Sequence, residues 1–253
     1  MINILLCGAN GKMGKAVYLA AENSNDLKIA AGFDINTDSY GDFKIYNDFS
    51  LIQEDIDCII DFSHPSCFDA TLEFATTNKI PYIICTTGLS ESQKKAFQDA
   101  SEVSPVFYSA NMSVGVNLIT TLSKIASKVL EDAFDIEIIE KHHNQKLDAP
   151  SGTALALADA ISETVSYNPK YTYDRHSVRK KREKEEIGIH AIRGGNIVGE
   201  HTVIFAGTDE IIEIKHSATS KEVFAQGAIR AARFMYKKPA GLYDMTNVLG
   251  SEI

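Results

Sequence analysis

The sequence has 253 residues, of which 44% are hydrophobic and 23% are charged, and its formal net charge is −9. These values are typical of a globular protein with a sizeable core, built as one large domain or two modest ones. The acidic excess argues against a nucleic-acid partner, because phosphate binding needs concentrated positive charge. It leaves an anionic small molecule open, since a local cationic pocket can lie in an acidic protein.

The first residues and the cysteines indicate a cytoplasmic protein. The chain opens with M-I-N-I-L-L-C-G, which lacks a basic segment ahead of its apolar run, so we expect no signal peptide. No apolar run approaches the ~18–20 residues of a membrane span. The four cysteines form no C-x-x-C pair, and we interpret Cys7, Cys58, Cys67 and Cys85 as reduced, mostly core-filling thiols.

A glycine-rich turn follows the first expected strand. Ile2–Cys7 is a short apolar run that predicts a buried strand, and G-A-N-G-K-M-G follows it, with glycines at Gly8, Gly11 and Gly14. The next residues, through Ala21, predict a helix. Strand, glycine turn and helix form the context of a dinucleotide site, where the backbone approaches a pyrophosphate at a helix N-terminus. The first glycine spacing is one residue wider than usual, so the context carries this prediction.

An acidic residue ends the second expected strand, Leu27–Phe33. Asp34 lies ~20 residues beyond the glycines, where such a side chain commonly holds the adenosine ribose hydroxyls. Ile35 and Asn36 follow it, with no adjacent arginine for a 2′-phosphate, although Lys12 is a cation that can contact one. We therefore predict NADH, or both NADH and NADPH, rather than strict NADPH use. The alternative is that Asp34 merely begins a turn.

Strands and helices continue to alternate as far as residue 113. Strands are expected at Asp57–Phe62, Pro81–Cys85 and Pro105–Tyr108, and helices at Phe68–Asn78 and Ser90–Ala100. This alternation predicts a parallel, doubly wound sheet of the Rossmann type. Ligands bind beyond the carboxyl ends of such strands, where this chain has polar loops of small residues.

The rest of the chain has a different pattern. Helices are expected at Val114–Leu130, Ala154–Thr164 and Phe224–Tyr236, and strands at Asp135–Glu140, Ile187–Ile192, Glu200–Ala206 and Glu210–His216. Clustered strands with short turns predict an α+β domain with a mixed or antiparallel sheet. The charge-dense residues 175–186 carry both signs, so we interpret them as a solvated loop rather than a nucleic-acid patch. The last helix is expected to return to the first domain.

The stretch Glu140–Ala154, E-K-H-H-N-Q-K-L-D-A-P-S-G-T-A, has the densest chemistry. His142 and His143 can exchange a proton near neutral pH, and Lys146 is a cation or a proton donor. Ser151, Gly152 and Thr153 lie where a helix begins, which is a favourable place for an anion. Together they indicate a pocket for a small carboxylate substrate. Beside a nucleotide fold, this pocket suggests hydride transfer with a protein group that moves the proton.

Two other kinds of site fit this stretch less well. Adjacent histidines point in different directions, and neither His142 nor His143 has a second histidine three to five residues away, so we predict no metal site. Ser151 lacks the G-x-S-x-G elbow of many serine hydrolases, which favours a helix-capping serine. On spacing alone, His142 and Lys146 remain open to interpretation as surface side chains.

The chain resembles the 4-hydroxy-tetrahydrodipicolinate reductase family, also called dihydrodipicolinate reductase. The stretch Glu140–Ala154 matches the family signature E-x-H-H-x-x-K-x-D-A-P-S-G-T-A. Further matches in the same order are G-A-N-G-K-M-G, D-F-S-H-P, T-T-G, S-A-N-M-S-V-G-V-N, H-A-I-R-G-G-N-I-V-G-E-H and G-L-Y-D-M. The resemblance covers essentially the whole chain.

The resemblance implies a cyclic dicarboxylate substrate, an NADH or NADPH cofactor and a homotetramer of two-domain subunits. Residues 1–111 and 218–253 would form the dinucleotide-binding domain, and 112–217 the substrate-binding and oligomerisation domain. His142 would donate the proton and Lys146 would be the second catalytic residue, while His143, Ser151, Gly152 and Thr153 would bind substrate. The cofactor would contact Gly8, Gly11, Lys12, Met13, Asp34, Phe62, Ser63, Cys85, Thr86, Thr87, Ala110, Asn111 and Met112.

Three positions depart from the family pattern. Lys12 replaces the commoner arginine of the glycine loop, and Asp34 lacks a following arginine. Cys85 replaces the glycine of G-T-T-G, where a thiol can crowd the nicotinamide or change its orientation. Arg193, in R-G-G, is as compatible with an interface as with a substrate contact. Two other functions remain open from the sequence: a different two-domain dehydrogenase, and an NAD(H) sensor without activity.

Overall fold

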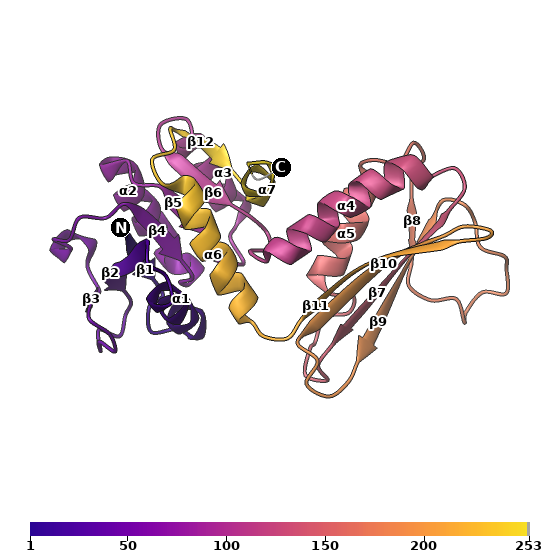
Figure 1. Ribbon diagram of the computed structural model, residues 1–253, viewed down its shortest axis with the longest axis horizontal. Helices are drawn as coiled ribbons and strands as arrows, with labels where there is room; N and C mark the ends of the chain where they lie inside the picture. The colour runs from indigo at the N-terminus through magenta and orange to yellow at the C-terminus, as the bar shows by residue number, and fades with distance from the viewer. Residues whose placement is uncertain (252–253) are drawn as a thin grey trace. The chain divides into compact units, whose positions relative to one another are not determined.

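The computed structural model describes residues 1–251 and divides into two compact units. The first unit is Met1–Val114 together with the segment that begins at Glu222, and the second is Gly115–Lys221. Figure 1 shows one sheet with its helices in each unit. Within the described residues, no helix has the length and apolar character needed to cross a membrane.

The first unit contains a seven-stranded sheet in which every neighbouring pair is parallel, in the order β12-β6-β5-β4-β1-β2-β3. The chain starts at β1 and winds outward in both directions, so the predicted doubly wound fold is confirmed. Its switch point lies between β1 and β4, where such sheets bind ligands. The strands are β1 (Ile2–Cys7), β2 (Leu27–Phe33), β3 (Lys44–Tyr46), β4 (Cys58–Asp61), β5 (Tyr82–Ile84), β6 (Pro105–Tyr108) and β12 (Gly241–Tyr243).

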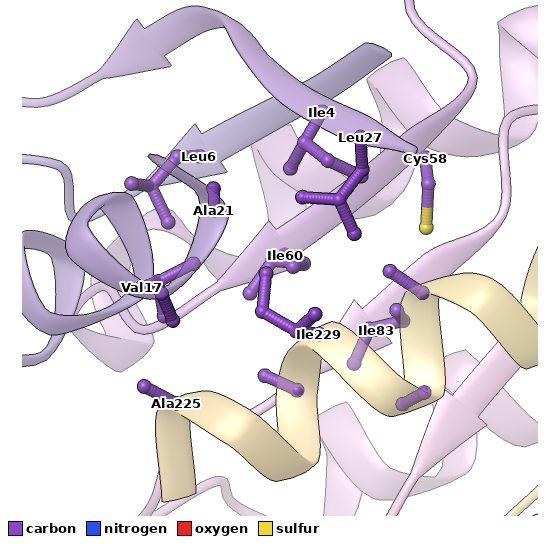
Figure 2. Packing of buried hydrophobic residues seen from close by; sticks show 14 of the residues in the cluster. Ile4, Leu6, Val17, Ala21, Leu27, Cys58, Ile60, Ile83, Ala225 and Ile229 are labelled. Atoms are coloured by element: carbon purple, nitrogen blue, oxygen red, sulfur yellow. The ribbon is translucent and has the colours of Figure 1, made fainter. Parts of the chain in front are cut away.

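Helices cover both faces of this sheet, because its strands are apolar on both sides. Ile4 and Leu6 face α1 and α6, whereas Leu5 and Cys7 face the layer of α2 and α3. Figure 2 shows α6 packed on the first face, as expected for the helix predicted at Phe224–Tyr236, which returns the chain to this unit. All four cysteines are free and three are buried. The helices are α1 (Lys12–Glu22), α2 (Phe68–Asn78), α3 (Glu91–Ala100), α6 (Glu222–Met235) and α7 (Met245–Gly250), with short 3₁₀ turns at Phe49–Leu51 and Pro65–Cys67.

The second unit contains a mixed five-stranded sheet in the order β11-β10-β7-β9-β8, as predicted. β7 (Asp135–His142) lies between β9 (Glu186–Arg193), to which it is parallel, and β10 (Gly199–Ala206), to which it is antiparallel. Consecutive β9 and β10 therefore do not pair with each other. The remaining elements are β8 (Lys170–Thr172), β11 (Ile211–Ala218), α4 (Val114–Leu130) and α5 (Gly152–Ser162), and the two helices cover one face of the sheet.

The sequence did not predict three short strands, β3, β8 and β12. Each has three residues and pairs with one neighbouring strand, so its conformation depends on tertiary contacts rather than on a local pattern. One boundary matters for function. β7 continues two residues beyond its expected end at Glu140, because Lys141 and His142 pair with Ile192 and Arg193 of β9.

Candidate active site

A buried carboxylate lies near the end of β7. Ile136 and Ile138 face the core of the second unit, and the alternation of side chains along a strand directs Glu140 and His142 to the same face. Glu140 is 0% exposed. It accepts two hydrogen bonds of 2.7 Å from the guanidinium of Arg193 and one of 3.0 Å from the Ser151 N–H, and its Oε2 lies 2.7 Å from His142 Nδ1.

These partners keep the carboxylate charged. Burial raises the pKa of Glu140, but hydrogen bonds from Arg193, His142 and the Ser151 backbone outweigh it, and the net shift of the pKa is downward. An ionised carboxylate can only accept hydrogen bonds, so the hydrogen between Glu140 and His142 lies on Nδ1. Nε2 is then the nitrogen of His142 that can exchange a proton.

Gly199, at the start of β10, lies beside Nε2 of the His142 ring. A Cβ at Gly199 would lie 3.1 Å from Nε2 of His142, so any larger residue would crowd the ring. The His142 side chain is 12% exposed. The ring is thus held by Glu140 at Nδ1, and its proton-exchanging nitrogen, Nε2, faces a residue without a side chain.

Lys146 lies in the loop that follows β7. Its ammonium is 2.8 Å from Asp148 Oδ1, and its side chain is 22% exposed. Lys146 donates a hydrogen bond that holds the pKa of Asp148 below its usual value. Arg193 also donates to the Asp148 carbonyl at 2.7 Å, which ties this loop to the buried carboxylate. His143 is partly exposed at the start of the same loop.

Ser151 caps α5, as the sequence predicted. Its Oγ accepts the Ala154 N–H at 3.1 Å and lies 2.9 Å from His201 Nε2, and the residue is 2% exposed. Gly152 is exposed, and a Cβ there would meet nothing within 4 Å. Thr153 is partly exposed in the same turn. The positive end of the α5 dipole and open space at Gly152 suit an anion.

Sequence reasoning gave no role to two of these groups and left a third open. The sequence motifs contain Glu140 and His201 without indicating a role for either, and they leave Arg193 open between an interface and a substrate contact. Strand alternation was a signal for each of them, because residues an even number apart on a strand share a face: Glu140 lies two residues after inward Ile138, Arg193 four after inward Ile189, and His201 two before inward Val203. A charged or polar residue at an inward strand position needs a buried partner.

The glycine loop of the first unit is tightly packed. Gly8 has a φ of +76°, and a Cβ there would lie 2.7 Å from the Phe62 carbonyl oxygen. A Cβ at Gly14 would lie 2.2 Å from the Gly8 carbonyl oxygen. Gly11 is the N-cap of α1 and has no side chain to offer its first N–H groups. Backbone donors at the end of β1 thus suit a pyrophosphate. Lys12 is exposed and Met13 partly so.

Asp34 lies at the end of β2, beside this loop. Its Oδ2 accepts the Asn10 N–H at 2.9 Å, and its Oδ1 accepts the Asn36 N–H at 3.2 Å. The Asn10 amide donates to the carbonyls of Asn36 and Asp38. Ile35 is 90% exposed. The chain therefore presents a carboxylate next to the glycine loop, and the adjacent exposed side chain is apolar.

A second buried acid organises the loop after β4. Asp61 is 0% exposed, accepts the Ser63 N–H at 2.7 Å and accepts the Tyr82 hydroxyl at 2.6 Å. Burial and the Asp61 charge raise the pKa of Tyr82, which keeps this donor protonated. The Thr86 hydroxyl donates to the Asp61 carbonyl at 3.3 Å. Phe62 is partly exposed beside Ser63.

Cys85 lies in the core of the first unit. It is 9% exposed, its Sγ is 4.0 Å from the Ile83 carbonyl oxygen, and burial raises its thiol pKa well above the ordinary value. Met112 is likewise 4% exposed in this core. Thr87 and Ala110 are exposed, and Asn111 is partly exposed. Exposed groups of these loops are therefore better placed for a ligand than the Cys85 and Met112 side chains.

Two family models match the chain. The model of the dihydrodipicolinate reductase N-terminus matches residues 2–112, and that of the dihydrodipicolinate reductase C-terminus matches residues 115–249. Together they span both units described above.

Individual proteins agree with these matches. A 4-hydroxy-tetrahydrodipicolinate reductase of Clostridium tetani is 49% identical over 251 residues, covering 99% of this chain and 98% of that protein. One from Caldanaerobacter subterraneus is 49% identical over 249 residues, with 98% of each chain covered. The structure of a dipicolinate-bound dihydrodipicolinate reductase from Paenisporosarcina has a TM-score of 0.82 at 22% identity, with 96% of this chain and 97% of that chain covered, and it shows the same fold.

Proposed function

Because the chain belongs to the dihydrodipicolinate reductase family, whose members are NAD(P)H-dependent reductases, we propose that it reduces 4-hydroxy-tetrahydrodipicolinate to tetrahydrodipicolinate in lysine and diaminopimelate biosynthesis. The observation that carries this proposal most directly is the buried Glu140 that holds His142 by Nδ1 beside a helix N-terminus. A proton-exchanging ring next to an anion site suits a reduction that ends with protonation of a carboxylate-bearing substrate.

The catalytic residues of the proposal are His142 and Lys146. Loss of the 4-hydroxyl group as water leaves the dihydrodipicolinate ring, and C4 of that ring receives the hydride. His142 gives a proton from Nε2 to the carbon adjacent to C4. Lys146 exchanges its ion pair with the Asp148 carboxylate for one with a substrate carboxylate. Both partners are carboxylates, so the ammonium keeps an oppositely charged neighbour. Glu140 fixes the Nδ1 hydrogen and the orientation of the His142 ring, so the hydrogen that is transferred is the one on Nε2 of the imidazolium.

The substrate is a cyclic dicarboxylate. Gly152 and Thr153 hold one carboxylate at the N-terminus of α5, and His143 provides a further contact. Ser151 supports this turn as its cap, because its hydroxyl already bonds to α5 and His201. The Paenisporosarcina relative is described as bound to dipicolinate, and a flat ring with two carboxylates is the kind of ligand that we propose here.

The cofactor is NADH or NADPH, which supplies the hydride when bound. The glycine loop fits a pyrophosphate, since Gly11 leaves the start of α1 without a side-chain cap and Gly8 lies close to Phe62. Lys12 and Met13 flank the phosphates and Asp34 takes the adenosine ribose. The proposed nicotinamide contacts are Phe62, Ser63, Thr86, Thr87, Ala110 and Asn111, with Cys85 and Met112 contributing backbone.

The test is oxidation of NADH or NADPH by purified protein in the presence of freshly generated 4-hydroxy-tetrahydrodipicolinate. We expect oxidation that depends on this substrate and is inhibited by dipicolinate. Amino acids and simple aldehydes serve as control substrates for a different dehydrogenase. Folded protein that oxidises no cofactor with the dipicolinate precursor, or that prefers a control substrate, contradicts the proposal.

We also propose that the protein is a cytoplasmic homotetramer. The support is the family membership and the five-stranded sheet, of which α4 and α5 cover one face only. Light scattering of the protein after size-exclusion chromatography tests this state, with a mass near four times 27.7 kDa expected. A monomer mass at micromolar concentration contradicts it.

A further inference from the structure

Behind Ser151 lies a buried histidine to which the proposed reaction gives no part. His201 comes from β10 and pairs in the sheet register with Glu140 of β7 and His216 of β11. It is 4% exposed, and its Nε2 lies 2.9 Å from Ser151 Oγ. Its other nitrogen, Nδ1, has no hydrogen-bond partner among residues 1–251. A buried polar atom without a partner is rare, and an apolar side chain would avoid its cost.

His201 is neutral at physiological pH. Burial, together with the nearby His142, lowers its pKa to about 4. The Ser151 oxygen already accepts the Ala154 N–H as the cap of α5. Nε2 of a neutral His201 either accepts the Ser151 hydroxyl hydrogen or donates its own hydrogen to that oxygen. In both tautomers the bond fixes the orientation of the Ser151 side chain.

Ser151 is in this way held from three elements at once. Its N–H donates to Glu140 of β7, its Oγ caps α5, and the same oxygen meets His201 of β10. The His201 ring also packs edge-on against the His142 ring, with centroids 5.2 Å apart and an interplanar angle of 70°. One side chain therefore contacts both the proposed proton donor and the cap of the proposed carboxylate site.

We propose that His201 is a positioning residue, which orients the turn Ser151–Thr153 for a carboxylate of the substrate. It acts through Ser151. This inference rests on the proposed function, because that function places a substrate carboxylate at the turn Ser151–Thr153. Its loss should weaken binding of the substrate and of its transition state equally, which raises KM and leaves kcat nearly unchanged.

The experiment compares His201→Met with His201→Gln. Methionine fills the space without a strong hydrogen bond, whereas the glutamine amide reaches about as far as Nε2. We expect His201→Met to raise KM for the substrate about tenfold, which corresponds to one hydrogen bond, with kcat within about threefold of wild type. His201→Gln should restore KM to within about threefold of wild type. His190→Met is the matched control, because His190 bonds to Glu137 on the opposite face of the sheet.

Binding of dipicolinate, measured by calorimetry, separates this inference from the proposed function. A tenfold loss of dipicolinate affinity in His201→Met, restored in His201→Gln, supports the positioning role even if the wild type shows no turnover. Circular dichroism and thermal melting establish that each variant is folded. An unchanged KM and dipicolinate affinity in folded His201→Met, equal losses in both variants, or a wild type that binds no dipicolinate overturns the inference.

Discussion

Two side chains carry the proposed chemistry, and their removal should affect different steps. His142→Gln keeps a polar group but cannot give a proton as imidazolium does, so kcat should fall on the order of 10²–10⁴-fold. Lys146→Ala removes the ammonium group that binds a substrate carboxylate, in addition to a catalytic group, so KM should rise and kcat should fall. Steady-state assays of both variants check this prediction. His176→Gln, in an exposed loop, is the control. Near-normal rates in both variants would remove these roles.

The pairing of Arg193 with Glu140 predicts a large effect on stability. Glu140 is 0% exposed, so Arg193→Met leaves a buried carboxylate without its main partner. Breaking a buried pair in this way costs about 3–5 kcal/mol of unfolding free energy, measured by urea denaturation. Lys215→Met breaks the partly exposed pair with Glu200 and should cost below about 1 kcal/mol of unfolding free energy. Similar losses of unfolding free energy in both variants would contradict the role of Arg193 as the main partner of the buried Glu140.

At the scale of elements, the contact between β10 and α5 makes stability depend on pH. His201 has a pKa of about 4 in the folded protein, against about 6.5 in an unfolded chain. The unfolded state therefore binds more protons between these values, and the unfolding free energy falls as pH drops from 6.5 to 4. Burial and the positive charge of His142 lower this pKa, whereas Glu140 opposes them. His216 and Lys146 contribute in the same direction as His142.

His201→Met isolates this contribution. A difference of about 2.5 pKa units, at about 1.36 kcal/mol each, predicts that wild type loses about 3 kcal/mol more than the variant over this range. Urea denaturation at pH 7, 5.5 and 4 measures the difference. Parallel curves for the two proteins would show that His201 titrates normally.

For the whole molecule, the sequence predicted both sheets because their patterns are local. Alternating strands and helices define the first unit, and Ser151 ahead of an apolar helix marks a cap. Two features depend on contacts that no local pattern contains. Arg193 meets Glu140 across 53 residues, through the register of β7 and β9. Cys85 turns its thiol into the core, a direction that the substituted motif alone did not reveal.

The preference for NADH or NADPH tests how the first unit recognises the adenosine ribose. The Asp34 carboxylate repels a 2′-phosphate, and Ile35 offers it no positive charge, so kcat/KM for NADH should equal or exceed that for NADPH. Lys12→Ala should lower kcat/KM for NADPH more than for NADH. Initial rates with both cofactors decide this. A strong NADPH preference in the wild type would contradict the interpretation of Asp34.

The most direct test of the central claim follows the two hydrogens into the product by mass spectrometry. A single turnover with reduced nicotinamide deuterated at the transferred position should give tetrahydrodipicolinate carrying that one deuterium. Unlabelled cofactor in D₂O should place one solvent deuterium on the adjacent carbon, at a rate that falls strongly in His142→Gln. A product without cofactor label, or solvent labelling equally fast in His142→Gln, would contradict the account.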